Sequence, residues 1–239
     1  MKLGVLTGSV FPGGLMFKDR MESEYGLPST APGLVKVGND ELIIIARHGS
    51  PPSIPPNMID HRANIGALLM EDVEGVISIC STGALRRDIK VPSIWVPEDY
   101  LDLYSGATIF RSGIHHITPK LDHRLRSALV RASWNVDLDV NDGGIYVQTR
   151  GPRLETKAEI RMLSRFGDLV GMSLGSECTI SCEMGLPLAG ITTVDNYANG
   201  IGEEELDFND ILASASGKWD MVRELLVETV KILGKPIVE

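Results

Sequence analysis

The sequence predicts a single α/β domain that spans residues 1–239. Two continuous apolar runs of strand length, at 41–46 and 76–80, are typical of strands in a sheet that is covered on both faces. Segments with helical periodicity lie between such runs. A chain of 239 residues with 43% hydrophobic content is long enough to bury a substantial core in one domain.

The predicted elements alternate along the chain, and short apolar runs predict the strands. Strands are expected at 3–6, 41–46, 76–80, 94–97, 100–103, 144–148 and 169–172, with one more just before Asn196. Helices are expected at 59–70 and 121–133, on each side of the 169–172 strand, and at 219–233, whose apolar stripe indicates packing. Residues 18–34 are expected to form a loop or a short edge strand, and 207–215 precede the last helix.

Composition and charge exclude several classes of function. A net charge of −9 disfavours a nucleic-acid partner, which needs a basic face. No apolar run approaches the roughly 20 residues of a membrane span, and the N-terminus does not resemble a secretory signal. Three cysteines without Cys-x-x-Cys spacing favour reduced thiols and a cytoplasmic location. The neighbouring His115 and His116 lack further ligands, so no metal site is predicted.

Small or cationic residues follow several predicted strands. Ser9, the Arg47-His48 pair, Ser81 and Ser173 stand in these positions. Because the carboxyl ends of parallel strands lie on one side of a sheet, such residues are expected to gather into an anion site. An ordinary surface charge at a strand exit is the alternative for Arg47.

Two further residues suit the edge of a purine base. Glu155 precedes a predicted helix and Asn196 follows a predicted strand. A carboxylate accepts hydrogen bonds while an amide both donates and accepts, so the two together match the edge of a 6-oxopurine. Alternatively, Glu155 is a first-turn acid that the helix dipole favours, and Asn196 is a turn residue. Met172 offers an apolar surface for a sugar or a base.

These residues belong to motifs that resemble the trimeric purine nucleoside phosphorylase and methylthioadenosine phosphorylase family. The motifs occur in the family's order over nearly the whole chain: TGS at 7–9, ARHG at 46–49, ANI at 63–65, STGAL at 81–85, GPRLETKAE at 151–159, GMS at 171–173 and DNY at 195–197. The resemblance implies an α/β fold with a distorted, mixed central sheet flanked by helices. It also implies a homo-oligomer, as a trimer or a dimer of trimers, no organic cofactor or metal, and inorganic phosphate as co-substrate.

The resemblance also implies a role for each matching residue. Phosphate is expected to contact Ser9, Arg47, His48, Cys80, Ser81 and Ser173. The nucleoside is expected to contact Met172, Leu154, Asn196, Tyr197, Ala198 and His116, with His115 as the alternative to His116 in reaching a neighbouring subunit's sugar pocket. Cys80 departs from the hydroxyl residue of methylthioadenosine phosphorylases, which leaves its side-chain contact open.

Two positions indicate the branch of the family. Glu155 and Asn196 resemble the 6-oxopurine enzymes, and Ala198 replaces an aspartate of adenine-specific relatives. Phe208 aligns with a histidine that binds the 5′-hydroxyl in 6-oxopurine nucleoside phosphorylases. An apolar ring there favours a methylthio group, although Phe208 could instead pack in the core.

The function that these residues predict is cleavage of S-methyl-5′-thioinosine by phosphate, which releases hypoxanthine and 5-methylthioribose 1-phosphate in purine salvage. Asn196 is expected to act in catalysis by stabilising charge on the purine, while Glu155 holds N1–H. The alternatives are a 6-oxopurine nucleoside phosphorylase acting on inosine or guanosine, a methylthioadenosine phosphorylase, a purine-binding sensor and a nucleosidase that uses water. No nucleic-acid or membrane partner is expected.

Overall fold

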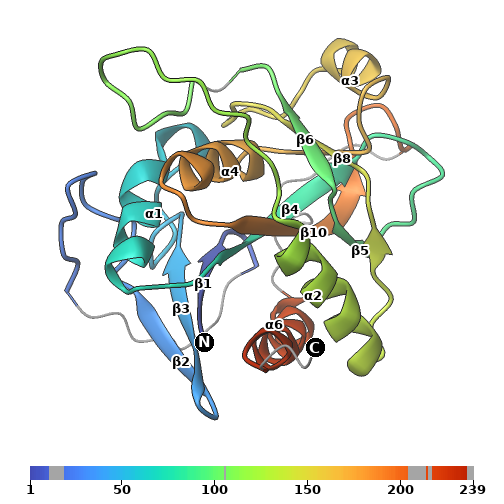
Figure 1. The fold of residues 1–239 in the computed structure, drawn as a ribbon. Helices are drawn as coiled ribbons and strands as arrows, with labels where there is room; N and C mark the ends of the chain where they lie inside the picture. The colour runs from blue at the N-terminus through green and yellow to red at the C-terminus, as the bar shows by residue number, and fades with distance from the viewer. Residues whose placement is uncertain (11–18, 105, 204–213, 215–216, 236–239) are drawn as a thin grey trace.

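The computed structural model describes residues 1–10, 19–104, 106–203, 214 and 217–235. In this part of the chain the strands form one mixed, ten-stranded sheet (Figure 1). Its centre consists of four parallel strands in the order β3 (Asp40–Ala46), β1 (Lys2–Thr7), β4 (Val76–Ala84) and β10 (Leu188–Tyr197). The predicted α/β fold with a mixed sheet is confirmed.

Shorter strands extend this centre on both sides. The flanking strands are β2 (Gly33–Val37), antiparallel to β3, and β5 (Ser93–Val96), antiparallel to β10, followed by β7 (Asn141–Asp142). A branch of three parallel strands, β6 (Asp99–Asp102), β8 (Ile145–Gln148) and β9 (Leu169–Gly171), joins the carboxyl end of β4 through an antiparallel β9 contact. This branch distorts the sheet where the long strands end.

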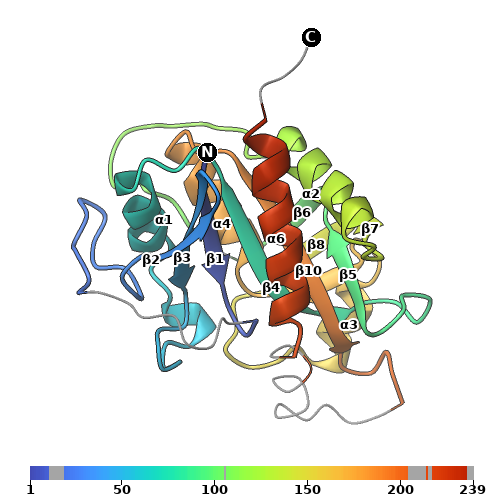
Figure 2. The ribbon, with the colours of Figure 1, turned by 90° about the horizontal axis from the view of Figure 1, so that it is seen from below.

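Helices cover both faces of the sheet. Figures 1 and 2 show α1 (His61–Met70) and α4 (Leu174–Glu183) on one face, and α2 (His123–Asn135) and α6 (Trp219–Leu233) on the other. The short α3 (Lys157–Leu163) lies beyond the β8 end, and a 3-10 turn (Pro56–Met58) precedes α1. None of the described helices combines the length and apolar character needed to cross a membrane.

The helices on both faces of the sheet explain why the apolar runs in the sequence are continuous. Side chains alternate between the faces of a strand. In β3, Leu42 and Ile44 belong to the buried cluster that contains side chains of α2 and α6, whereas Ile43 and Ile45 belong to the cluster that contains side chains of α1 and α4. All four are buried because both faces are covered.

Several predicted bounds need correction. The run at 76–80 does not end in a turn at 81–85, because β4 continues to Ala84 and pairs there with both β10 and β9. Asn196 lies inside β10 rather than after it. The predicted helix at 219–233 is confirmed without change, while most of 207–215 falls outside the described residues.

Candidate active site

The predicted phosphate residues come from neighbouring elements at one edge of the sheet. β1, β3, β4 and β10 are parallel, so their carboxyl ends lie together, where α/β proteins bind ligands. β9 pairs with the end of β4, which brings the β9–α4 junction at Ser173 to the same edge. Cys80 Sγ lies 3.4 Å from Ser173 Oγ and 3.2 Å from Ser78 Oγ.

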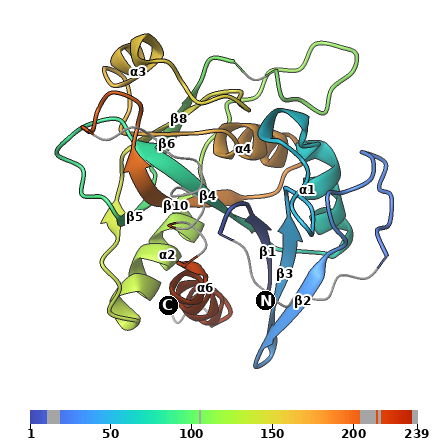
Figure 3. The same cartoon turned by 180° about the vertical axis from the view of Figure 1, so that it is seen from behind.

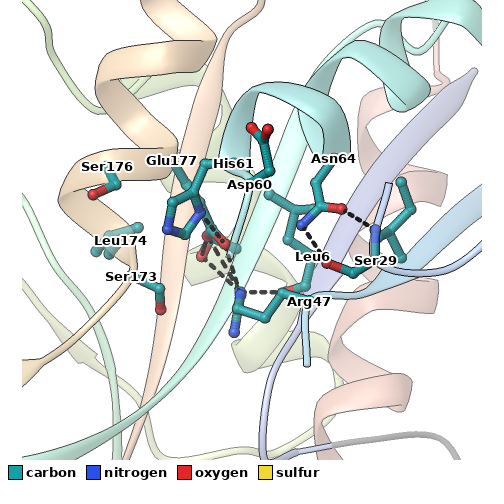
Figure 4. Close-up of polar contacts among 12 residues, drawn as sticks. Leu6, Ser29, Arg47, Asp60, His61, Asn64, Ser173, Leu174, Ser176 and Glu177 are labelled. Atoms are coloured by element: carbon teal, nitrogen blue, oxygen red, sulfur yellow. Dashed lines mark hydrogen bonds and ion pairs between the residues drawn. The ribbon is translucent and has the colours of Figure 1, made fainter. Parts of the chain in front are cut away.

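A buried ion pair between Arg47 and Glu177 lies beneath this edge (Figure 4). Arg47 Nε donates to Glu177 Oε1 at 2.6 Å, and Nη2 lies 3.2 Å from Oε2. The guanidinium also donates to the main-chain oxygens of Ile79 at 2.8 Å and Leu6 at 2.9 Å. Ser78 Oγ donates to Glu177 Oε2 at 2.5 Å. One guanidinium therefore joins β1, β3, β4 and α4.

Both partners of this pair are charged. Burial opposes ionisation of Glu177, but the Arg47 charge, the neighbouring His61 and the Ser78 hydroxyl together outweigh burial and lower the pKa of the carboxyl to about 2. Burial likewise opposes the charge of Arg47, but Glu177 together with other neighbouring groups outweighs burial and raises the pKa of the guanidinium. The two charges cancel within the protein.

Arg47 is neither an exposed phosphate-binding residue nor an ordinary surface charge. Only 1% of the residue is exposed. An added Cβ at Gly8 would stand 2.4 Å from Arg47 Nη1, so the β1–Ser9 turn lies directly over the guanidinium and requires glycine there. Arg47 thus supports the turn that carries Ser9. Ser9 itself is half-buried.

His48 faces the same turn from β3. Its Nδ1 lies 2.8 Å from the main-chain oxygen of Ile54, an acceptor, so Nδ1 carries the proton and Nε2 has the lone pair in the neutral ring. Burial lowers the pKa of His48, and the Arg47 charge lowers it further, which favours this neutral form. An added Cβ at Gly8 would lie 3.6 Å from His48 Nε2.

The remaining predicted phosphate residues are polar but uncharged. Burial raises the pKa of the Cys80 thiol, so it stays protonated near neutral pH. Ser173 N donates to the Tyr146 hydroxyl at 3.1 Å, which anchors the start of α4. Ser81 Oγ donates to Asp195 at 2.5 Å and is thus directed toward β10.

The two predicted base-reading residues lie on adjoining segments. The Asn199 amide donates to the main-chain oxygen of Glu155 at 2.9 Å and joins the segment before α3 to the end of β10. Glu155 is buried, and its Oε1 accepts from the Thr149 hydroxyl at 2.5 Å. Asn196 Nδ2 donates to the Tyr197 oxygen at 2.8 Å. No described residue donates to Glu155 Oε2 or Asn196 Oδ1.

Met172 lies beside the base segment. An added Cβ at Gly151 would stand 2.4 Å from its sulfur, so the loop that leads to Glu155 packs directly on this side chain. Leu154 is partly exposed, and Ala198 is buried with its N–H bonded to Ala84. The Tyr197 hydroxyl donates to Ile89 at 3.0 Å, which directs the ring toward the 87–89 segment.

The remaining predicted contacts are not brought to this edge. His116 is exposed, and His115 stacks on Phe110 with 3.9 Å between the ring centroids. Both belong to the long loop between β6 and α2, which extends away from the sheet in Figure 3. Phe208 lies outside the described residues.

Four polar residues near the site had no predicted role, although the DNY motif at 195–197 contains one of them, Asp195. Glu177 and Asp195 are buried acids, and Lys218 pairs with Asp195. His61 Nδ1 lies 3.5 Å from Glu177 Oε1 in a geometry that makes no hydrogen bond, and no other described residue bonds to it. For Glu177, the sequence does carry a signal of burial, because it is the one acid within the otherwise small and apolar stretch LGSECTIS at 174–181.

Replacing Glu177 with glutamine is expected to destabilise the protein strongly. The variant leaves the Arg47 charge buried without its partner, so the free energy of unfolding should fall by about 3–5 kcal/mol in urea denaturation. Asp142→Asn breaks a half-exposed pair with Arg126 and should lower it by only about 0–1 kcal/mol. Equal effects of the two variants would contradict the role of the buried pair.

Acidic pH should remove the difference in the free energy of unfolding between the wild type and Glu177→Gln. The folded-state pKa of Glu177 is lowered from 4.5 to about 2, so its stabilisation is complete above the unfolded value and is lost as pH falls through the folded one. The stability gap between the wild type and Glu177→Gln should therefore narrow from pH 4.5 toward pH 2. A gap that is independent of pH would show that the carboxylate charge is not what stabilises the fold.

Comparison with known proteins identifies the family. The phosphorylase superfamily profile matches residues 24–231. The chain is 42% identical over 213 residues to a probable 6-oxopurine nucleoside phosphorylase of Archaeoglobus fulgidus, covering 89% of this chain and 87% of the relative. It is 29% identical to a probable S-methyl-5′-thioinosine phosphorylase of Thermodesulfovibrio yellowstonii, covering 98% and 91%.

A solved structure shows the same fold. The methylthioadenosine phosphorylase of Schistosoma mansoni in complex with adenine superposes with a TM-score of 0.88 at 24% identity, covering 99% of this chain and 93% of that one. Together with the profile match over most of the chain, these similarities confirm the resemblance seen in the motifs. The chain belongs to the phosphorylase superfamily.

Proposed function

We propose that this enzyme cleaves the N-glycosidic bond of 6-oxopurine nucleosides with inorganic phosphate, and that S-methyl-5′-thioinosine is its preferred substrate. The products are hypoxanthine and 5-methylthioribose 1-phosphate. The observation that carries the 6-oxopurine assignment is the hydrogen bond from the Asn199 amide to the main-chain oxygen of Glu155, which joins the segment of Glu155 to the end of β10, where Asn196 lies. It holds a carboxylate and an amide on adjoining segments at the ligand-binding edge of the sheet.

The two side chains match the hydrogen-bonding edge of hypoxanthine. Glu155 Oε2 accepts from N1–H, while Oε1 is occupied by Thr149. Asn196 keeps one Nδ2 hydrogen for O6 after bonding Tyr197, and its Oδ1 accepts from N7–H. Adenine has an unprotonated N1 that would face the carboxylate without a hydrogen, which disfavours it.

The anion site uses neutral groups because the Arg47 charge is cancelled by Glu177. Main-chain N–H groups at the β1–Ser9 turn, the hydroxyls of Ser9 and Ser173, and His48 remain to hold phosphate. The neutral His48 Nε2 accepts a hydrogen bond from the P–OH group of HPO₄²⁻, in line with the lowered pKa that keeps the ring neutral. The buried pair holds these groups in position.

The proposed chemistry needs no protein nucleophile. A phosphate oxygen attacks C1′ as the C1′–N9 bond breaks, and the purine leaves with the bonding electron pair. The proton of HPO₄²⁻ ends on the purine, so atoms and charge balance. Asn196 stabilises the negative charge that develops on the purine, and the fixed loops hold both reactants in line.

In this proposal, the preference for the 5′ substituent of the nucleoside depends on Phe208. An apolar ring favours a methylthio group over a hydroxyl, which needs a hydrogen-bond partner. Inosine or guanosine is the second candidate, because the relative from Archaeoglobus fulgidus is named a probable 6-oxopurine nucleoside phosphorylase. The test is kcat/KM for methylthioinosine, inosine, methylthioadenosine and adenosine at saturating phosphate. Preference for either adenine nucleoside would reject the proposal.

Asn196→Asp is expected to shift base preference. The ionised carboxylate repels O6 of hypoxanthine and accepts from the amino group of adenine, so the inosine-to-adenosine ratio of kcat/KM should fall about tenfold or more. Asn135→Asp, on the exposed surface of α2, provides the matched control and should leave the ratio unchanged. An unchanged ratio in Asn196→Asp would show that this side chain does not contact the base.

Phe208→His is expected to exchange the preferred 5′ group. A hydrogen-bond donor would replace apolar surface, so the methylthioinosine-to-inosine ratio of kcat/KM should fall by roughly ten- to a few hundred-fold. Phe166→His, at an exposed position after α3, is the control. A parallel loss of both activities would remove the methylthio assignment and leave a general 6-oxopurine nucleoside phosphorylase.

We further propose that the enzyme is a homo-oligomer, a trimer or a dimer of trimers. The β6–α2 loop that carries His116 exposes apolar side chains, including Ile114 at 86% and Leu103 at 61%, which an interface would cover. Light scattering should give the mass of a trimer or hexamer, and Ile114→Asp should lower it. A monomeric, fully active wild-type protein would contradict this assembly.

A further inference from the structure

Asp195 occupies an irregular position in β10. Val194 pairs with Thr82 and Asn196 pairs with Gly83, so Asp195 is an extra residue that has no opposite partner on β4. Such a β-bulge changes the direction of the following side chains and often lies next to an active site. Here the next residue is Asn196, the proposed base contact.

The carboxylate of Asp195 is held by four donors. Oδ2 accepts from the Ser81 hydroxyl at 2.5 Å and the Thr193 hydroxyl at 2.9 Å. Oδ1 accepts from Lys218 Nζ and, at 3.4 Å, from the Ser214 hydroxyl. The Asp195 side chain is fully buried, and only 12% of the Lys218 side chain is exposed. The ion pair is thus largely shielded from water and salt.

Lys218 connects the bulge to a rigid part of the core. It immediately precedes α6, which begins near the carboxyl end of β10 in Figure 2. Val222, Leu225 and Leu226 of α6 are fully buried against the sheet and α2. Movement of the Lys218 main chain therefore requires movement of this packed helix.

We propose that Asp195 and Lys218 are positioning residues that hold the bulge so that the Asn196 amide faces the base. Successive side chains of a strand alternate between its faces, so a shift of the bulge by one residue would turn Asn196 away. The inference rests on the proposed function. It assigns the C-terminal helix a part in base recognition that the residue motifs do not contain.

The test measures hypoxanthine affinity by calorimetry in the presence of phosphate, together with the phosphate KM and the Tm. Lys218→Met should weaken hypoxanthine binding about tenfold or more, because a small misplacement of a binding group has an effect of this size. The same variant should change the phosphate KM less. Lys218→Arg should largely restore affinity. Lys231→Met, which removes an exposed lysine of α6, should have no effect.

A double variant keeps the test informative if Lys218→Met does not fold. Asp195→Asn with Lys218→Met removes both charges, so no buried charge is left unpaired, yet it also loses the anchor and should bind hypoxanthine weakly. Wild-type affinity in a folded variant, or parallel losses for hypoxanthine and phosphate, would overturn the inference. Failure of the wild type to bind hypoxanthine would instead overturn the proposed function, and this inference with it.

Discussion

The buried pair of Arg47 and Glu177 is the interaction on which the candidate site depends. Its guanidinium bonds to main-chain oxygens at Leu6 and Ile79 as well as to the carboxylate on α4. Because a buried charge without its partner is strongly unfavourable, the ends of β1 and β3, the middle of β4 and the start of α4 are held as one unit. The protein groups next to these elements that we propose to bind phosphate are therefore held in fixed positions.

A second buried pair, Asp195 with Lys218, lies at the base side of the same edge. The two pairs have a common consequence for chemistry. Each cancels a charge inside the protein, so neither carboxylate is left to repel phosphate or the departing purine. The groups that we propose to contact the reactants are neutral amides, hydroxyls and an imidazole, apart from Glu155, which faces N1–H. Fixed dipoles of this kind stabilise developing charge without rearranging during the reaction.

Local pattern was sufficient for much of the fold. The runs at 41–46 and 219–233 predicted β3 and α6 because their burial is visible in adjacent residues. The extension of β4 through Ser81 was missed because its small residues resemble a turn until β10 and β9 pair with them. The burial of Arg47 was also missed, since its partner Glu177 is 130 residues away. The bulge at Asp195 likewise depends on the register between two strands.

In the proposed reaction, phosphate and not water accepts the sugar. The most direct measurement follows hypoxanthine release from S-methyl-5′-thioinosine and from inosine, with and without phosphate, and identifies the sugar product. We predict that release requires phosphate and yields one pentose 1-phosphate for each hypoxanthine. Release without phosphate, with free sugar as the product, would contradict it.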